Sequence, residues 1–191
     1  MASYDSLSGF RTLVDAYDPG NQWRNAQGLI AETFPHNIAV GPQALVSGTC
    51  YFSQIFIPGG KTLTNCHVSN SITGVSITVA RIGLYDTAGT LLASCANQSS
   101  AWEAVGFKSQ ALSAAYTVGT SGIYYAGVVT VAATGPGLVL GLAAAASRIG
   151  ATDPLSGKPI YFGSTQSLSD LPSPLTVAAG TAPGLPWIAF S

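Results

Sequence analysis

The sequence predicts an all-β protein: an antiparallel β-sandwich of the jelly-roll kind, preceded by an N-terminal arm. From Ala44 onward, about eight or nine short runs of β-branched and aromatic residues alternate with turn signals spaced about 8 to 14 residues apart. No helical periodicity separates these runs, and this favours antiparallel pairing over a parallel sheet. We therefore expect two packed sheets, with a jelly roll as the topology.

The first 43 residues differ from the rest, and we expect an attachment arm over 1–43 and the sandwich over 44–191. Charged residues are denser in the arm. A short helix over 8–17 would place four apolar side chains on one stripe: Phe10, Leu13, Val14 and Tyr17. The sequence DPGN at 18–21 predicts a helix stop or a turn. The arm could dock onto a partner; equally, it could be a first strand and its lead-in.

The runs beyond the arm are expected to be strands bounded by turn residues. In chain order they are 49–57, 62–68, 72–85, 90–96, 105–112, 123–132, 138–146, 158–162 and 186–190, and 138–146 could instead be a short helix. Two turns, 58–61 and 86–89, carry glycine where a positive φ is needed. Within 72–85 the apolar alternation slips near Arg81, which predicts a β-bulge.

The composition excludes several function classes. Charged residues make up only 8% of the 191 residues, against about 25% in average proteins. Such a surface suits a protein packed against copies of itself or against neighbours. Seven Lys and Arg residues and a net charge of −1 cannot form a phosphate-binding stripe, so no nucleic acid is expected as a partner.

The sequence does not predict a membrane span or a secretory signal. The longest apolar stretch, 122–146, is interrupted by Gly-Pro-Gly at 135–137, whereas a spanning helix needs about 20 predominantly apolar residues. Residues 1–20 lack a basic segment followed by an apolar run.

The residues that could support catalysis or metal binding are sparse. His67 follows Cys66, and neighbouring strand residues point to opposite faces, so the two cannot readily act together. The acidic residues stand mostly alone, and Asp86 fits turn chemistry better than metal binding, so no metal or cofactor is expected. A glycosidase-like pair of Glu103 with Asp86 or Asp153 remains an open alternative.

Cysteines and aromatic residues give the remaining candidates. Cys50 and Cys66 could form a disulfide across a hairpin, although three buried reduced thiols are favoured. Three aromatic residues are candidate ligand or interface contacts: Trp102, in a polar loop, and the strand neighbours Tyr124 and Tyr125. Trp102 could stack on a sugar, but packing at the sandwich rim or an oligomer interface is favoured.

Four stretches, in this order and spacing, carry a family resemblance: VSGTCYFSQIFIPGGKTLTNCHV (46–68), IGLYDTAGTLLASC (82–95), AYTVGTSGIYYAGVVTVA (115–132) and PWIAFS (186–191). Together they resemble the β-sandwich domains in virion proteins of tailed bacteriophages, especially phages that infect actinobacteria. The resemblance covers roughly residues 36–191, and its specificity lies in the combination of turns rather than in any one of them.

The resemblance implies a non-enzymatic structural role in a virion assembled in the host cytoplasm. Such domains end minor tail proteins and fibres or decorate heads, often as trimers, so the expected partners are other virion proteins and further copies of this chain. No catalytic residue carries over. The chain looks complete with only a short arm, which favours a small attached accessory protein. The alternative is an adhesin that binds host-surface glycan through a loop such as 97–103.

Overall fold

The computed structural model describes residues 19–39, 41–143, 161–163, 168–175 and 184–191. Eight strands form four nested antiparallel pairs: β2 (Gly41–Ala44) with β9 (Gly137–Ala143), β3 (Cys50–Ile57) with β8 (Gly122–Thr134), β4 (Thr62–Ile72) with β7 (Gly106–Thr117), and β5 (Val75–Tyr85) with β6 (Leu91–Ser94). The ribbon of pairs is rolled up, because β9 also pairs with β4 and β8 with β5.

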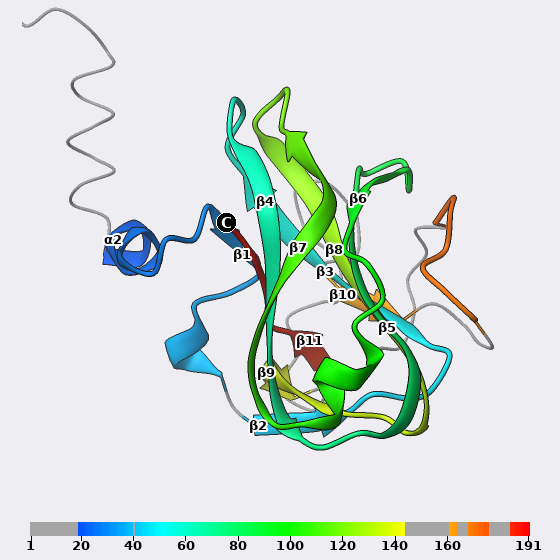
Figure 1. Ribbon diagram of the computed structural model, residues 1–191. Helices are drawn as coiled ribbons and strands as arrows, with labels where there is room; N and C mark the ends of the chain where they lie inside the picture. Colours follow the sequence, from blue (N-terminus) through cyan, green and yellow to red (C-terminus); the bar gives the residue numbers. More distant parts are fainter. Residues whose placement is uncertain (1–18, 40, 144–160, 164–167, 176–183) are drawn as a thin grey trace, which may run out of the picture.

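The resulting strand orders, β2-β9-β4-β7 in one sheet and β3-β8-β5-β6 in the other, are those of a jelly roll. The predicted all-β antiparallel sandwich is therefore confirmed (Figure 1). Four short strands extend the sheets: β1 (Ala31–Glu32), β10 (Tyr161–Gly163), β11 (Gly184–Pro186) and β12 (Ile188–Phe190). The sheets have seven and five strands.

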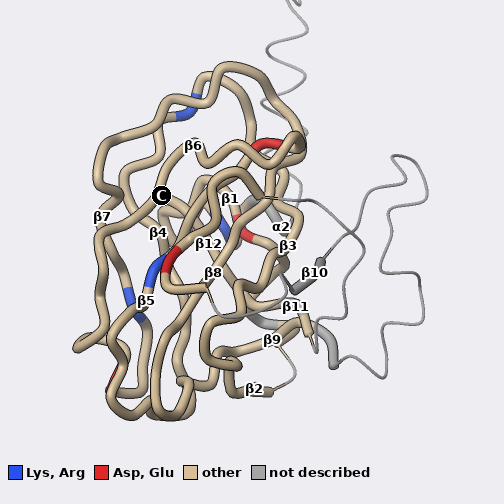
Figure 2. Tube along the Cα trace, turned by 90° about the vertical axis from the view of Figure 1, so that its right-hand side faces the viewer, with Lys and Arg blue, Asp and Glu red and all other residues tan. Residues whose placement is uncertain are grey.

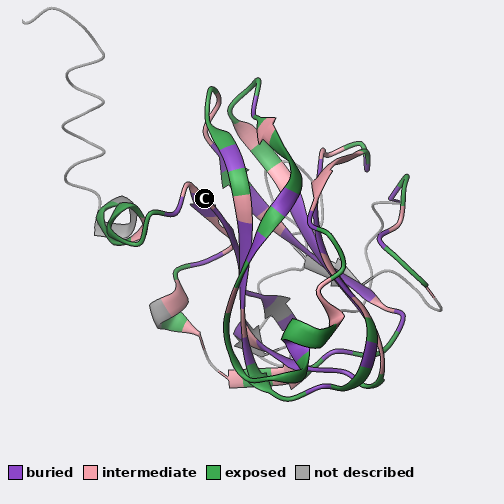
Figure 3. Cartoon of the chain, in the orientation of Figure 1, coloured by how far each residue is buried: buried purple, intermediate pink, exposed green. Residues whose placement is uncertain are grey.

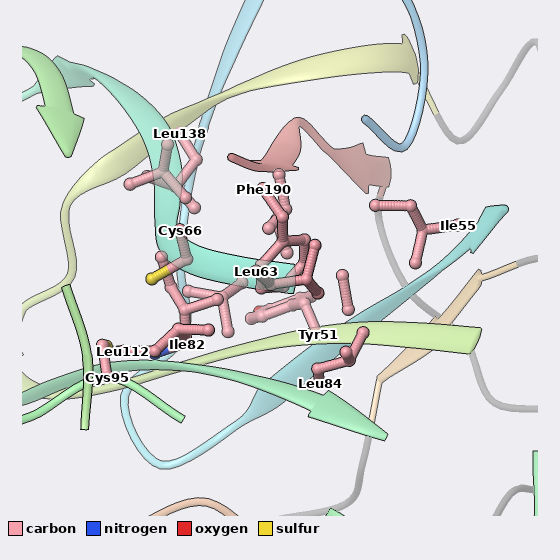
Figure 4. Packing of buried hydrophobic residues seen from close by; sticks show 14 of the residues in the cluster. Tyr51, Ile55, Leu63, Cys66, Ile82, Leu84, Cys95, Leu112, Leu138 and Phe190 are labelled. Atoms are coloured by element: carbon pink, nitrogen blue, oxygen red, sulfur yellow. Dashed lines mark hydrogen bonds between the residues drawn. The ribbon is translucent and has the colours of Figure 1, made fainter. Parts of the chain in front are cut away.

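The main core lies between the two sheets (Figure 4). Alternate residues of each strand point inward, so that both sheets contribute buried apolar side chains, among them Tyr51, Ile55, Ile82, Leu84, Leu63, Cys66, Leu138 and Phe190. Burial of these side chains holds the sheets together, at about 1.5–3 kcal/mol for each large aliphatic or aromatic group.

Each sheet also has a covered patch on its outer face. On the five-stranded sheet, Cys50, Phe52 and Tyr85 pack beneath Leu171 and Leu175. On the seven-stranded sheet, Trp187 and Ala189 pack with Leu29 and Phe34. Segments far from these strands in sequence therefore act as covers, and they explain why strands such as β8 are buried on both faces (Figure 3).

The expected boundary between arm and sandwich at residues 43 and 44 is wrong. β1 pairs with β12, and β2 pairs with β9, so that both belong to the seven-stranded sheet. Leu29, Ala31 and Phe34 are buried, because their apolar side chains complete the sheet and its outer patch. For this part of the arm, the alternative of a first strand and its lead-in is correct. The stripe of Phe10, Leu13, Val14 and Tyr17 lies outside the described residues.

Two local expectations also differ from the structure. The stop or turn predicted at 18–21 is instead the beginning of helix α2 (Pro19–Ala26), because proline's fixed φ suits the first helical turn, where its missing N–H is not needed. The irregularity in β5 lies between Ile77 and Val79, with Ser76 at a positive φ of 51°, rather than near Arg81.

Two other expectations concern the apolar stretch 122–146. Its described part forms β8 and β9, so residues 137–143 are strand and not helix. Within the described ranges, no helix has both the length and the apolar character that crossing a bilayer requires.

Candidate functional site

Trp102 is a core residue and not a surface contact. It lies in the 3₁₀ helix η2 (Ser99–Glu103), and its side chain is fully buried in the main core. Its backbone carbonyl accepts a hydrogen bond of 3.2 Å from Asn70 Nδ2, which attaches the loop to β4. Of the alternatives for Trp102, sugar stacking and an oligomer interface are therefore wrong, whereas packing within the sandwich is what the structure shows. The polar neighbours that suggested exposure lie on the outer side of this turn. The indole of Trp102 lies on its inner side, in the core.

The structure places Tyr124 and Tyr125 on opposite faces of β8. Tyr125 is fully buried in the outer patch of the five-stranded sheet, so it cannot contact a ligand or partner. Tyr124 is partly exposed, and its hydroxyl donates a 2.8 Å hydrogen bond to the carbonyl of Thr120. The three predicted aromatic contacts therefore do not form one site.

All three cysteines are buried, and none of them forms a disulfide. Cys50 lies in the outer patch and Cys66 in the core, so the suggested Cys50–Cys66 disulfide is absent. Cys66 instead lies near Cys95. The Cys95 thiol donates to Gln110 Oε1 at 3.2 Å, and the Cys66 thiol donates to the Gln110 carbonyl at 3.5 Å.

This arrangement shifts the pKa values of the two thiols in opposite directions. The neighbouring Cys95 thiol and burial raise the pKa of Cys66. The neighbouring Cys66 thiol, helped by the hydrogen bond from the amide of Ile82, lowers the pKa of Cys95. The pair sits in the closed core, where it packs rather than reacts with molecules in solution.

The two histidines lie on the outer face of the seven-stranded sheet, on either side of Trp187 and Phe107. The ring of His67 stacks on Phe107 at 5.4 Å, and the ring of His36 meets Trp187 edge-on at 4.8 Å. Burial lowers the pKa of His67. As expected, Cys66 points to the opposite face, so the sequence neighbours do not form a catalytic pair.

The described carboxylates have structural partners. Asp86 Oδ1 accepts from the amides of Ala88 and Thr90 at 2.9 and 2.8 Å, as its turn chemistry predicted. Glu103 accepts from the amide of Ile77, and Asp170 forms a bidentate ion pair with Arg81. In the described ranges, no group of three or more His, Cys, Asp or Glu side chains is arranged to hold a metal ion.

Among the described residues, a groove between β6 and β7 is the candidate binding site; we call it the β6–β7 groove. It has a volume of about 270 Å³ and is lined by eight residues: Leu91, Leu92, Ala93, Ser94, Ser113, Ala114, Ala115 and Tyr116. None of these residues is charged. The groove is therefore suited to bind a neutral group that forms hydrogen bonds with the main chain.

Sequence reasoning did not find this groove. The signal was present as the run of small, uncharged residues in SQALSAA (109–115). It became informative only with the strand pairing, because a run of this kind also fits an ordinary edge strand.

The sequence matches no model of a known protein family and no curated protein.

Proposed function

We propose that this chain is a non-enzymatic structural protein of a bacteriophage virion. It would be a surface-exposed jelly roll attached to the particle as a minor tail protein or as a capsid decoration, and it would assemble with copies of itself and with other virion proteins. The proposal rests on the family resemblance of the sequence and on one structural observation, the character of the surface.

That surface is poor in charge and exposes large apolar side chains. The charged residues of the described chain are few and form no large patch of one sign (Figure 2), and one opposite pair, Arg81 and Asp170, is in direct contact. Phe107, Val105 and Phe56 are 58, 56 and 53% exposed. Removing apolar surface from water is favourable by about 25 cal/mol per Å². A partner that covers these side chains would therefore stabilise the assembled state over the free chain.

The glycan-binding alternative loses its main support. It depended on Trp102 in the 97–103 loop and on the strand residues Tyr124 and Tyr125; Trp102 and Tyr125 are both fully buried, and Tyr124 is only partly exposed. Sugar binding by stacking needs an accessible aromatic face, and neither of the two buried residues provides one. We therefore do not propose a glycan ligand.

The proposal is tested on purified particles of a phage that encodes this chain. Mass spectrometry should find the protein at constant stoichiometry through successive density-gradient steps, and immunogold labelling should place it on the head or the tail. An abundant host protein that is lost over the same steps serves as the control. The proposal fails if the chain is made during infection but is removed from particles together with that control.

A further inference from the structure

The β6–β7 groove is an antiparallel ladder that has opened. β6 and β7 are the outermost strands of their sheets on this side of the sandwich (Figure 1), and Cys95 and Leu112 form an isolated bridge between them. Continued from this bridge, the register would place Ser94 opposite Ser113, and Leu91 opposite Tyr116. These are the residues that line the groove, so the strands separate where pairing would otherwise continue.

β7 is also separated from its other neighbour at this place. The register between β4 and β7 passes from Leu63–Tyr116 directly to Asn65–Ala111. Among the described residues, the register therefore gives the segment Ser113–Ala115 no partner on β4 or on β6. All three residues are exposed. A new strand can therefore pair with this segment without displacing a strand that is paired with it now.

The walls of the groove lack two of the features that prevent strand addition. Proteins protect open sheet edges with charged residues, proline, bulges, short strands or a covering segment. The eight lining residues include no charged residue and no proline. Each wall is four residues long, about 13 Å. The volume of the groove, about 270 Å³, lies just below the range of small-molecule sites, roughly 300–1,000 Å³, and its two strand walls suit an extended segment.

We propose that the occupant is a second copy of this chain, whose Ser113–Ala115 segment pairs antiparallel with the same segment of the first copy about a two-fold axis. Identical segments are self-complementary in this arrangement. The small side chains allow close approach, and the lack of charge removes repulsion between copies. The inference rests on the self-assembly included in the proposed function and specifies the surface used. It favours even copy numbers over the trimer that the resemblance implied.

The test compares two identical substitutions in the full chain. Ala114→Lys places two like charges across the proposed two-fold axis, whereas Ala104→Lys adds the same charge at an exposed alanine outside the groove. Light scattering across a concentration series should give a dimer or a multiple of it for the wild type and for Ala104→Lys. For Ala114→Lys the dimer should be weaker, with a dissociation constant about tenfold higher or more. Circular dichroism melts establish that both variants fold.

A second measurement does not depend on any variant. In the wild-type chain, amide hydrogen exchange at residues 112–117 and 91–94 should slow as the concentration rises through the association range. A chain that stays monomeric, a trimer, association unaffected by Ala114→Lys, or unchanged exchange in the groove would each overturn the proposal. The last three results leave the virion role standing, because they only move the contact to another surface.

Discussion

At the scale of single residues, Asp86 shows how one side chain can fix a turn. Its carboxylate accepts the amides of Ala88 and Thr90, and Gly89 adopts the positive φ of 93° that closes the loop. Slight burial raises the pKa of Asp86, but the hydrogen bonds from Thr90, Ala88 and Gly89 together outweigh it, so the pKa is lowered. The charged form is therefore the one that the fold prefers.

This preference gives a pH-dependent prediction. Asp86→Ala should lower the free energy of unfolding at pH 7 by about 1 kcal/mol, since the site is exposed and solvent weakens the hydrogen bonds. A lowered pKa in the folded state stabilises the fold above the ordinary carboxyl pKa, and this contribution is lost as the pH falls through the folded value. Urea unfolding should therefore show the difference at pH 7 and little of it near about pH 2.5.

A matched variant distinguishes the effect of the hydrogen-bond acceptor at position 86 from the effect of its negative charge. Asp86→Asn keeps an oxygen that can accept the same two amides, so it should be closer to wild type than Asp86→Ala at pH 7 and should show no carboxylate titration. Equal destabilisation by Asp86→Asn and Asp86→Ala would contradict the assignment of the stabilising effect to accepted hydrogen bonds.

At the scale of elements, the turn after β5 also anchors the segment that covers the outer face of the five-stranded sheet. The amide of Leu175 donates a 2.7 Å hydrogen bond to the carbonyl of Gly89. A side chain at Gly89 would collide with the backbone oxygen of Leu175. Glycine is therefore required at this position for two reasons: the turn needs a positive φ, and the covering segment lies too close to leave room for a side chain.

Two glycine substitutions test this double requirement. Gly60 has a similar positive φ of 75°, but a Cβ there would meet nothing within 4 Å. Gly60→Ala should cost about 1 kcal/mol, for backbone strain alone. Gly89→Ala should cost about 3 kcal/mol or more, because the cover must also move. Denaturant unfolding measures both, and equal costs would show that the cover does not depend on Gly89.

At the scale of the whole molecule, the sequence was informative where structure is locally determined. Strand runs, the Asp86 turn and the opposite directions of Cys66 and His67 depend on neighbours within a few residues, and these were predicted. The roles of 29–44 depend on β9 and β12, about 90 to 160 residues further along the chain. The burial of Trp102 and the opening of the β6–β7 groove likewise depend on distant pairing, which no local pattern in the sequence records.

The rolled-up topology also separates the cysteines into two layers of different stability. Cys66 and Cys95 lie between the sheets, so exposing them requires the sandwich to open. Cys50 lies under the short segment 168–175, which is held by contacts such as the Arg81–Asp170 ion pair and the backbone hydrogen bonds of Leu168 and Leu175. Local opening of such a cover costs less than global unfolding.

Thiol labelling under native conditions should therefore resolve two rates. With a small thiol reagent in excess and mass spectrometry of the peptides, Cys50 should react first. Cys66 and Cys95 should react together, more slowly, at a rate that follows global unfolding as denaturant is added. Arg81→Gln, which removes the ion pair to Asp170, should accelerate Cys50 several-fold and leave the slower pair less affected. If all three cysteines reacted at one rate in both proteins, the outer patch and the core would be a single cooperative unit.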